Sequence, residues 1–106
     1  MHTGIDIPAS AGTTVIAADT GRVIMATTYG GFGKTVILDH GGGVSTQYSH
    51  LSVISVSQGD IVTKGNKVGG VGTTGLSTGN HLHFQVTING STVDPLNNGK
   101  YFVSPK

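Results

Sequence analysis

The sequence has no cysteine, no tryptophan and no glutamate among its 106 residues. Without cysteine, a disulfide framework, a thiolate zinc site and a thiol nucleophile are all excluded. Charged residues make up only 10% of the chain and the net charge is +1 at pH 7, so no basic surface for nucleic acid is indicated. No apolar run approaches the length that spans a membrane, and no signal peptide is visible. We therefore expect a monomeric domain over residues 1–106 that contacts neither nucleic acid nor membrane.

Glycine, in contrast, is abundant, with 18 residues spread along the chain. Together with frequent Thr, Val and Ser, this composition disfavours helices and favours short strands joined by tight turns. Period-two alternation of apolar residues recurs and no helical periodicity is sustained. The expected fold is all-β, with mostly antiparallel strands closed or stacked into a sandwich or barrel. The predicted strands are 13–18, 21–27, 34–40, 44–51, 53–56, 60–63, 67–72 and 81–88.

Two segments resemble each other weakly. "GTTVIAADTGRVI" and "GDIVTKGNKVGGVG" share a glycine, a valine three residues on, and then a turn glycine followed by a valine. Each reads as a hairpin, and the turns "DTG" and "SQG" mark further strand connections. An internal duplication and a chance likeness between two hairpins explain this pattern equally well.

The segment "HLHFQVTI" is the clearest predicted strand and the most informative one. Alternation places Leu82, Phe84, Val86 and Ile88 on one face, which suits the core, and puts polar side chains on the other. Those polar residues are His81, His83, Gln85 and Thr87. Two imidazoles on the polar face of one strand are a common metal-binding arrangement, although a surface position is the more frequent reason for such a pair.

The N-terminal segment "MHTGIDI" raises the weight of the metal interpretation. His2 and Asp6 share a face of an extended chain, and Gly4 between them leaves room. Imidazole and carboxylate together suit zinc. An exposed His and Asp near a chain end would need no function. Because the same small domain also holds the His81–His83 pair, a metal site is favoured over an exposed pair without function.

Further polar residues could border the same site. In "STQYSHLS", Tyr48 and His50 share a face by parity, opposite Leu51. His40 is interpreted as a packed histidine at a hairpin end and is left out of the chemistry. "GFGKT" is not a phosphate loop, because a strand rather than a helix follows it. "GVGTTG" is expected to bring its backbone close to a peptide or to the metal site.

These motifs together resemble the lysostaphin-type, LytM-like zinc metalloendopeptidases of peptidoglycan. The likeness runs from His2 to Pro95 through "HTGIDIPASAGTTVIAADTGRV", "GGFGKTVILDHGGGVSTQYSHLS", "VSQGDIVTKGNKVGGVGTTGLSTGNHLHFQV" and "NGSTVDP". The H-x-x-x-D and H-x-H elements are specific in combination. The resemblance implies a mostly antiparallel β-fold with a groove and an internal duplication related to biotinyl-type hairpins.

The resemblance also implies roles for individual residues. His2, Asp6 and His83 correspond to the zinc ligands, with one Zn²⁺ per chain and an open fourth position for water. His50 and His81 correspond to the catalytic pair beside the metal, with His81 the first choice as general base. The other histidine would hydrogen-bond the developing oxyanion, and Tyr48 is a weaker candidate for a substrate or oxyanion contact.

The chain departs from the family pattern at three points. Asn80 and Gln85 stand where Pro and Glu are frequent. Gln85 faces the predicted site, so it is expected to tune the hydrogen bonding of the ligands. Family domains usually carry a short segment before the first ligand that is lacking here, which predicts that such a segment would strengthen zinc binding.

The implied activity is hydrolysis of peptide cross-bridges or stem peptides of bacterial peptidoglycan. The implied location is extracellular, at the cell wall or in the periplasm, or on a phage particle. Two alternatives stay open at this point. A non-catalytic LytM-like module that binds or activates other wall hydrolases would be expected to lose ligands, and all of them are present. A biotinyl- or lipoyl-type carrier would need a lysine with its flanking pattern, which "VTKGNK" lacks.

Overall fold

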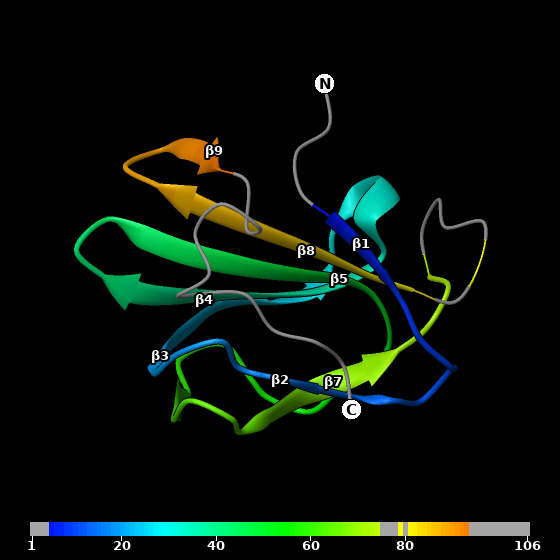
Figure 1. Cartoon of the computed structure of the whole chain (residues 1–106). Helices are drawn as coiled ribbons and strands as arrows, with labels where there is room; N and C mark the ends of the chain where they lie inside the picture. The colour runs from blue at the N-terminus through cyan, green and yellow to red at the C-terminus, as the bar shows by residue number, and fades with distance from the viewer. Residues whose placement is uncertain (1–4, 75–78, 80, 94–106) are drawn as a thin grey trace.

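The protein folds into antiparallel β-structure, as the sequence predicts. The computed structural model describes residues 5–74, 79 and 81–93 (Figure 1). In this part of the chain the only helical element is the 3₁₀ turn η1 (Gly30–Phe32), and no helix there is long and apolar enough to cross a membrane. The strands are β1 (Ile5–Pro8), β2 (Thr14–Ile16), β3 (Gly21–Thr28), β4 (Lys34–Gly41), β5 (Val44–Ile54), β6 (Ile61–Val62), β7 (Lys67–Val71), β8 (His81–Ile88) and β9 (Ser91–Val93).

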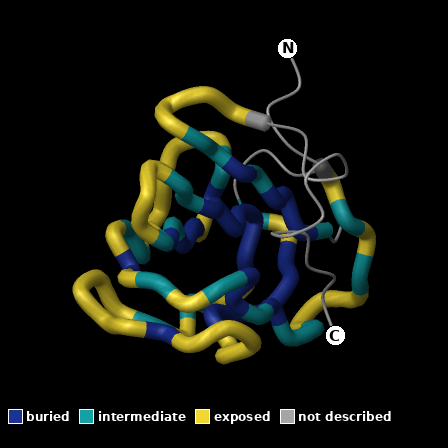
Figure 2. Tube along the Cα trace, turned by 60° about the vertical axis from the view of Figure 1, so that its left-hand side comes forward, coloured by how far each residue is buried: buried dark blue, intermediate teal, exposed yellow. Residues whose placement is uncertain are grey.

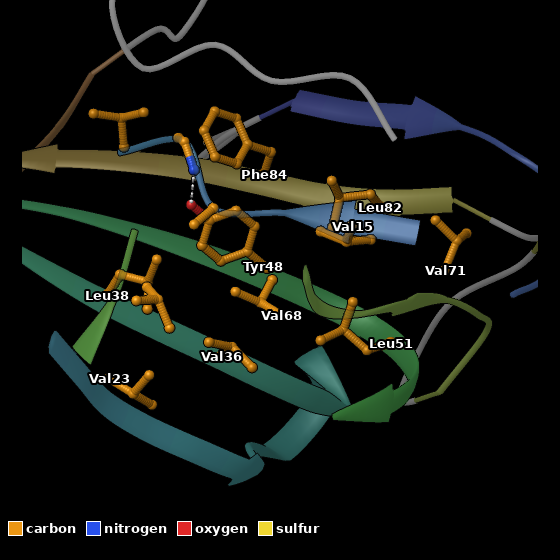
Figure 3. Packing of buried hydrophobic residues seen from close by; sticks show 14 residues of the cluster. Val15, Val23, Val36, Leu38, Tyr48, Leu51, Val68, Val71, Leu82 and Phe84 are labelled. Carbon is orange, nitrogen blue, oxygen red and sulfur yellow. Dashed lines mark hydrogen bonds between the residues drawn. The ribbon is translucent and has the colours of Figure 1, made fainter. Parts of the chain in front are cut away.

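The sheet has the order β1-β8-β5-β4-β3-β6, and every pairing is antiparallel. Strand β7 joins β2 to β5, and β9 pairs with β8 through a turn at Asn89 and Gly90. Both turn residues have positive φ, which is the conformation that an Asn-Gly hairpin turn requires. In Figure 1, strands β8, β5, β4 and β3 form a fan above the β2–β7 pair. Figure 3 shows core side chains filling the space between these two groups.

The two similar segments do not form the hairpins that were predicted for them. Strand β2 pairs with β7 rather than with β3, and β3 pairs with β6. The strands of segment 12–24 therefore pair with the strands of segment 59–72 and not with each other. This reciprocal pairing fits the predicted duplication. The predicted strand 53–56 is also corrected, because its first two residues continue β5 and do not pair with β6.

The glycine run of β7 lets two backbones approach closely. A Cβ at Gly69 would lie 2.4 Å from the carbonyl oxygen of Val53, and one at Gly72 would lie 2.5 Å from the amide of Ser52. Both distances are far below van der Waals contact. The close approach expected from "GVGTTG" is thus made to strand β5 of the same chain.

The core forms on the face that the alternation of β8 predicts. Leu82, Phe84 and Val86 are completely buried, and they pack with buried residues of the other strands (Figures 2 and 3). Tyr48 lies in the same core, with its ring centroid 5.4 Å from that of Phe84. A ring with no exposed surface cannot contact a substrate, so the predicted substrate contact of Tyr48 is wrong.

The Tyr48 hydroxyl belongs to a chain of hydrogen bonds that runs from the core to the surface. It accepts from the Ala18 amide at 2.9 Å, in the contact drawn in Figure 3, and lies 2.8 Å from Thr46 Oγ1. Thr46 Oγ1 lies 2.7 Å from His40 Nε2, and His40 Nδ1 lies 2.9 Å from the Thr20 carbonyl oxygen. The carbonyl only accepts, so His40 donates from Nδ1 and accepts at Nε2 when it is neutral. His40 is therefore a packed histidine at the hairpin ends, as predicted.

Burial raises the pKa of Tyr48 from 10.0 to about 12. Between these pH values the folded protein keeps a proton that the unfolded chain loses, so stability should fall as pH rises from 10 to 12. The two-unit difference corresponds to a loss on the order of 2 kcal/mol at pH 12. We expect urea unfolding to show this loss of stability in the wild type and not in Tyr48→Phe. Tyr29→Phe, which changes an exposed tyrosine, is the control and should lose stability with pH as the wild type does. Parallel pH profiles for wild type and Tyr48→Phe would contradict the assignment.

Candidate active site

Strand β1 brings Asp6 onto the histidine face of β8. The register pairs Asp6 with His83 and Pro8 with His81. Asp6 Oδ1 lies 3.0 Å from His83 Nδ1 and 3.4 Å from His81 Nε2. The carboxylate is half exposed, whereas the two imidazoles are largely covered. Two histidines that follow Asp6 by 75 and 77 positions in the chain thus meet at one carboxylate oxygen.

His83 is held from two further sides. Its Nε2 lies 3.4 Å from Gln85 Oε1, two residues along the same strand. Its ring centroid lies 5.4 Å from that of Phe32 in η1, and Phe32 in turn stacks with Tyr29 at a centroid distance of 5.7 Å. Both Asp6 Oδ1 and Gln85 Oε1 only accept, so a neutral His83 donates to one of them, and a ligand role at Nδ1 requires its proton on Nε2, toward Gln85. Gln85 thereby faces the site as the strand alternation predicts.

His50 reaches the site by a different route from the one predicted. Strand β4 pairs Val36 with Tyr48 and Lys34 with Leu51, so two residues of β5, Ser49 and His50, oppose one residue of β4. This is a β-bulge, and His50 within it has a positive φ of 61°. The extra residue shifts the alternation. Tyr48 and Leu51 consequently share the core face, and the predicted common face of Tyr48 and His50 is wrong.

The rings of His50 and His81 face each other across the site. Their centroids are 5.0 Å apart in an edge-to-face arrangement, and His50 lies 6.1 Å from His83. His50 Nδ1 is 2.7 Å from the Thr74 carbonyl oxygen, and His81 Nδ1 is 3.0 Å from that of Gly79. Each neutral ring therefore carries its proton on Nδ1 and has a lone pair on Nε2. Both are suited to accept a proton, and a donor role at Nε2 requires the imidazolium form.

Sequence reasoning missed Thr74 and Phe32. Thr74 acts through its backbone carbonyl, which no side-chain pattern can reveal. Phe32 lies in "GGFG", which was considered only as a phosphate loop. The available signal for Phe32 was an aromatic residue inside a glycine-rich turn. Glycines on both sides of it allow its side chain to cover a neighbouring strand.

The described residues fit a metal ion of the zinc type. Two ligand atoms bound to a tetrahedral zinc lie about 3.3–3.5 Å apart, and the 3.0 Å between Asp6 Oδ1 and His83 Nδ1 is slightly shorter than this. Carboxylate and imidazole are also the ligand types that zinc takes in proteins without thiolates. Within the described residues no three acidic or histidine side chains converge as a complete metal site. Asp6 and His83 are two of the three predicted ligands, and the third, His2, lies outside the described residues.

Comparison with known proteins identifies the family. Residues 1–95 match the sequence profile of Peptidase family M23. The chain belongs to this family. It is 46% identical over 96 residues to the DD-carboxypeptidase/endopeptidase Mpg of Neisseria meningitidis, covering 91% of the chain and 22% of that protein. It is 36% identical over 95 residues to the peptidoglycan DD-endopeptidase ShyA of Vibrio cholerae, covering 90% and 22%. The chain thus spans about a fifth of the length of these relatives.

Solved structures confirm the predicted fold and family. The catalytic domain of the antimicrobial peptidase lysostaphin from Staphylococcus simulans superposes with a TM-score of 0.86 at 36% identity, covering 92% of this chain and 78% of that domain. A zinc-containing peptidase from Vibrio cholerae gives a TM-score of 0.86 at 30% identity, covering 99% of this chain and 31% of that one. The resemblance inferred from the H-x-x-x-D and H-x-H elements is therefore correct.

Gln85 offers a test of how His83 is oriented. Removing the acceptor of a ligand's second N–H typically costs 10–100-fold in metal affinity. We expect Gln85→Leu to weaken zinc binding by about this factor, and Gln85→Glu to retain it, as measured by competition with a fluorescent chelator. Thr87→Val, two positions further along the same face, is the matched control. Equal zinc affinity in Gln85→Leu and the wild type would show that Gln85 does not orient His83.

Proposed function

We propose that this domain is a zinc-dependent endopeptidase that hydrolyses peptides of bacterial peptidoglycan. The observation that carries the proposal is the position of Asp6 Oδ1, 3.0 Å from His83 Nδ1, with His81 and His50 beside this pair. Ligands and acid–base groups in one small cluster are what metal-assisted hydrolysis requires. The names of the relatives, an endopeptidase of peptidoglycan among them, support the same activity.

In this proposal His2, Asp6 and His83 hold the zinc ion. Three protein ligands leave one position open, which is typical of catalytic rather than structural zinc. When bound there, zinc supplies an activated water nucleophile at neutral pH and polarises the scissile carbonyl. Gln85 fixes the His83 ring, and Phe32 covers it. Covering the ring limits the approach of bulk water to the ligand.

His81 and His50 handle the protons. His81 Nε2 lies 3.4 Å from the ligand oxygen of Asp6, so it would stand close to a nucleophile held beside the metal. Once protonated, the imidazolium donates from Nε2 to the leaving amine. His50, 5.0 Å away, also presents Nε2 and can stabilise developing negative charge only as an imidazolium. We assign the pair jointly to general acid–base catalysis, with His81 as the first acceptor.

The substrate is proposed to be the peptide part of the cell wall, at the cross-bridge or the stem. The domain would then act at the cell wall or in the periplasm, or from a phage particle. We propose that the domain acts as a monomer. Purified cell walls, a cross-linked stem-peptide dimer and a pentaglycine bridge are the substrates with which to assay it.

Three single variants separate ligand from acid–base residues. His83→Ala removes a ligand, so its zinc content should collapse from about one ion per chain. His81→Ala and His50→Ala should keep zinc and lose about 10²–10⁴-fold in turnover. Zinc is measured by mass spectrometry after gel filtration and turnover by release of free amines from cell walls. A loaded His83→Ala beside an empty His81→Ala would reverse the assignment within "HLH".

Metal removal tests the enzyme class as a whole. Dialysis against a chelator should abolish cleavage, and stoichiometric zinc should restore it. Cleavage by protein shown to be free of zinc would exclude this mechanism. A zinc-loaded wild type that cleaves none of the three substrates would instead indicate a non-catalytic binding module.

A further inference from the structure

His50 depends on a neighbour that none of the predicted roles includes. It lies at the point where β5 changes partner, pairing with β8 up to Ser49 and with β7 from Leu51. Its backbone is left-handed and its side chain is nearly buried. A ring on such a bulge is not directed by regular strand geometry, so another contact must direct it. That contact is the 2.7 Å hydrogen bond from Nδ1 to the Thr74 carbonyl oxygen.

Thr74 is itself fixed by its side chain. The hydroxyl donates to the Leu51 carbonyl oxygen at 2.6 Å and accepts from the Lys34 amide at 3.0 Å. Lys34 and Leu51 are the residue pair that flanks the bulge. The Thr74 hydroxyl therefore holds its own backbone against β4 and β5 at the residue pair next to His50.

Gly33 leaves the space that this arrangement needs. A Cβ at Gly33 would lie 2.4 Å from the carbonyl carbon of Thr74 and 2.5 Å from its carbonyl oxygen and its hydroxyl. Gly33 also has a φ of +69°, where side chains are disfavoured. Any side chain at this position would push against the same carbonyl that accepts from His50.

We propose that Thr74, seated against Gly33, is the positioning residue that sets the tautomer and ring direction of His50. A carbonyl oxygen can only accept, so it holds the proton on Nδ1 and leaves Nε2 unprotonated, in a ring whose centroid lies 5.0 Å from that of His81. The Thr74 hydroxyl keeps that carbonyl in place. The inference rests on the proposed function of His50 for its effect on turnover, but not for its effect on the tautomer.

The kinetic test compares Thr74→Val with Thr74→Ser in the zinc-loaded protein. Valine keeps the shape and loses both hydroxyl bonds, whereas serine keeps both. Thr74→Val should lower kcat by about 10–100-fold, as expected for a displaced catalytic group, with KM and zinc content near those of the wild type. Thr74→Ser should retain most of the wild-type kcat. Thr13→Val, which loses a hydroxyl bond to the Ser10 carbonyl and no bond to the bulge, is the matched control.

A spectroscopic test does not depend on activity. Imidazole ¹⁵N shifts of zinc-loaded protein should show His50 protonated on Nδ1 in the wild type and in Thr74→Ser, and a mixture of tautomers in Thr74→Val. If the wild type cleaves nothing but shows this pattern, the proposed function fails and the positioning role stands. The inference is overturned if wild-type His50 carries its proton on Nε2, even should Thr74→Val not fold. It is equally overturned if folded Thr74→Val keeps the wild-type kcat, if Thr74→Ser is as impaired as Thr74→Val, or if zinc is lost together with kcat.

Discussion

The candidate site depends on one irregularity, the β-bulge at Ser49 and His50. A left-handed backbone at a residue with a side chain costs of order 1–3 kcal/mol, and the hydrogen bonds around the bulge offset this cost. The bulge allows Tyr48 and Leu51 to face the core while His50 faces the histidines of β8. With regular alternation, His50 would lie on the same face as Tyr48, inside the core. The bulge therefore provides both a continuous core and a further histidine at the candidate site.

The imidazoles near the site are oriented by acceptors that cannot donate. Carbonyl oxygens accept from Nδ1–H of His50 and His81, whereas His83 lies between two acceptors, Asp6 Oδ1 and Gln85 Oε1. In the proposed function, His83 presents Nδ1 to the metal and the other two histidines present Nε2. Three chemically identical side chains would then take different roles because their protons lie on different nitrogens.

The polar residues of the protein form two separate systems. His40, Thr46 and Tyr48 are linked by hydrogen bonds that run through the core to the Ala18 amide. The site residues lie on the other face of β8 and β5. The burial that raises the Tyr48 pKa marks a structural role, because its hydroxyl is satisfied within the core. A histidine and a tyrosine close in sequence to His50 therefore serve stability rather than chemistry.

The strand pattern and the candidate residues could be predicted wherever they depend on local periodicity. Strand β8 is the best example, since alternation alone placed Leu82 and Phe84 in the core and His83 and Gln85 opposite. The pairing of the strands could not be predicted from local periodicity. The segment "DTG" looks like a hairpin turn, yet β2 takes β7 as its partner, because pairing is decided by which distant strands bury the apolar faces.

What the sequence by itself determined is the residue inventory and the side of β8 on which the chemistry lies. The absence of cysteine, the H-x-H pair and the H-x-x-x-D element limited the metal ligands to imidazole and carboxylate. Only the tertiary structure decided that Asp6 meets His83, that Tyr48 is buried, and that Thr74 directs His50. These outcomes depend on a strand pairing between distant segments, on one extra residue in β5, and on a backbone carbonyl. None of the three leaves a periodic signal in the sequence, because each arises from contacts between residues far apart in the chain.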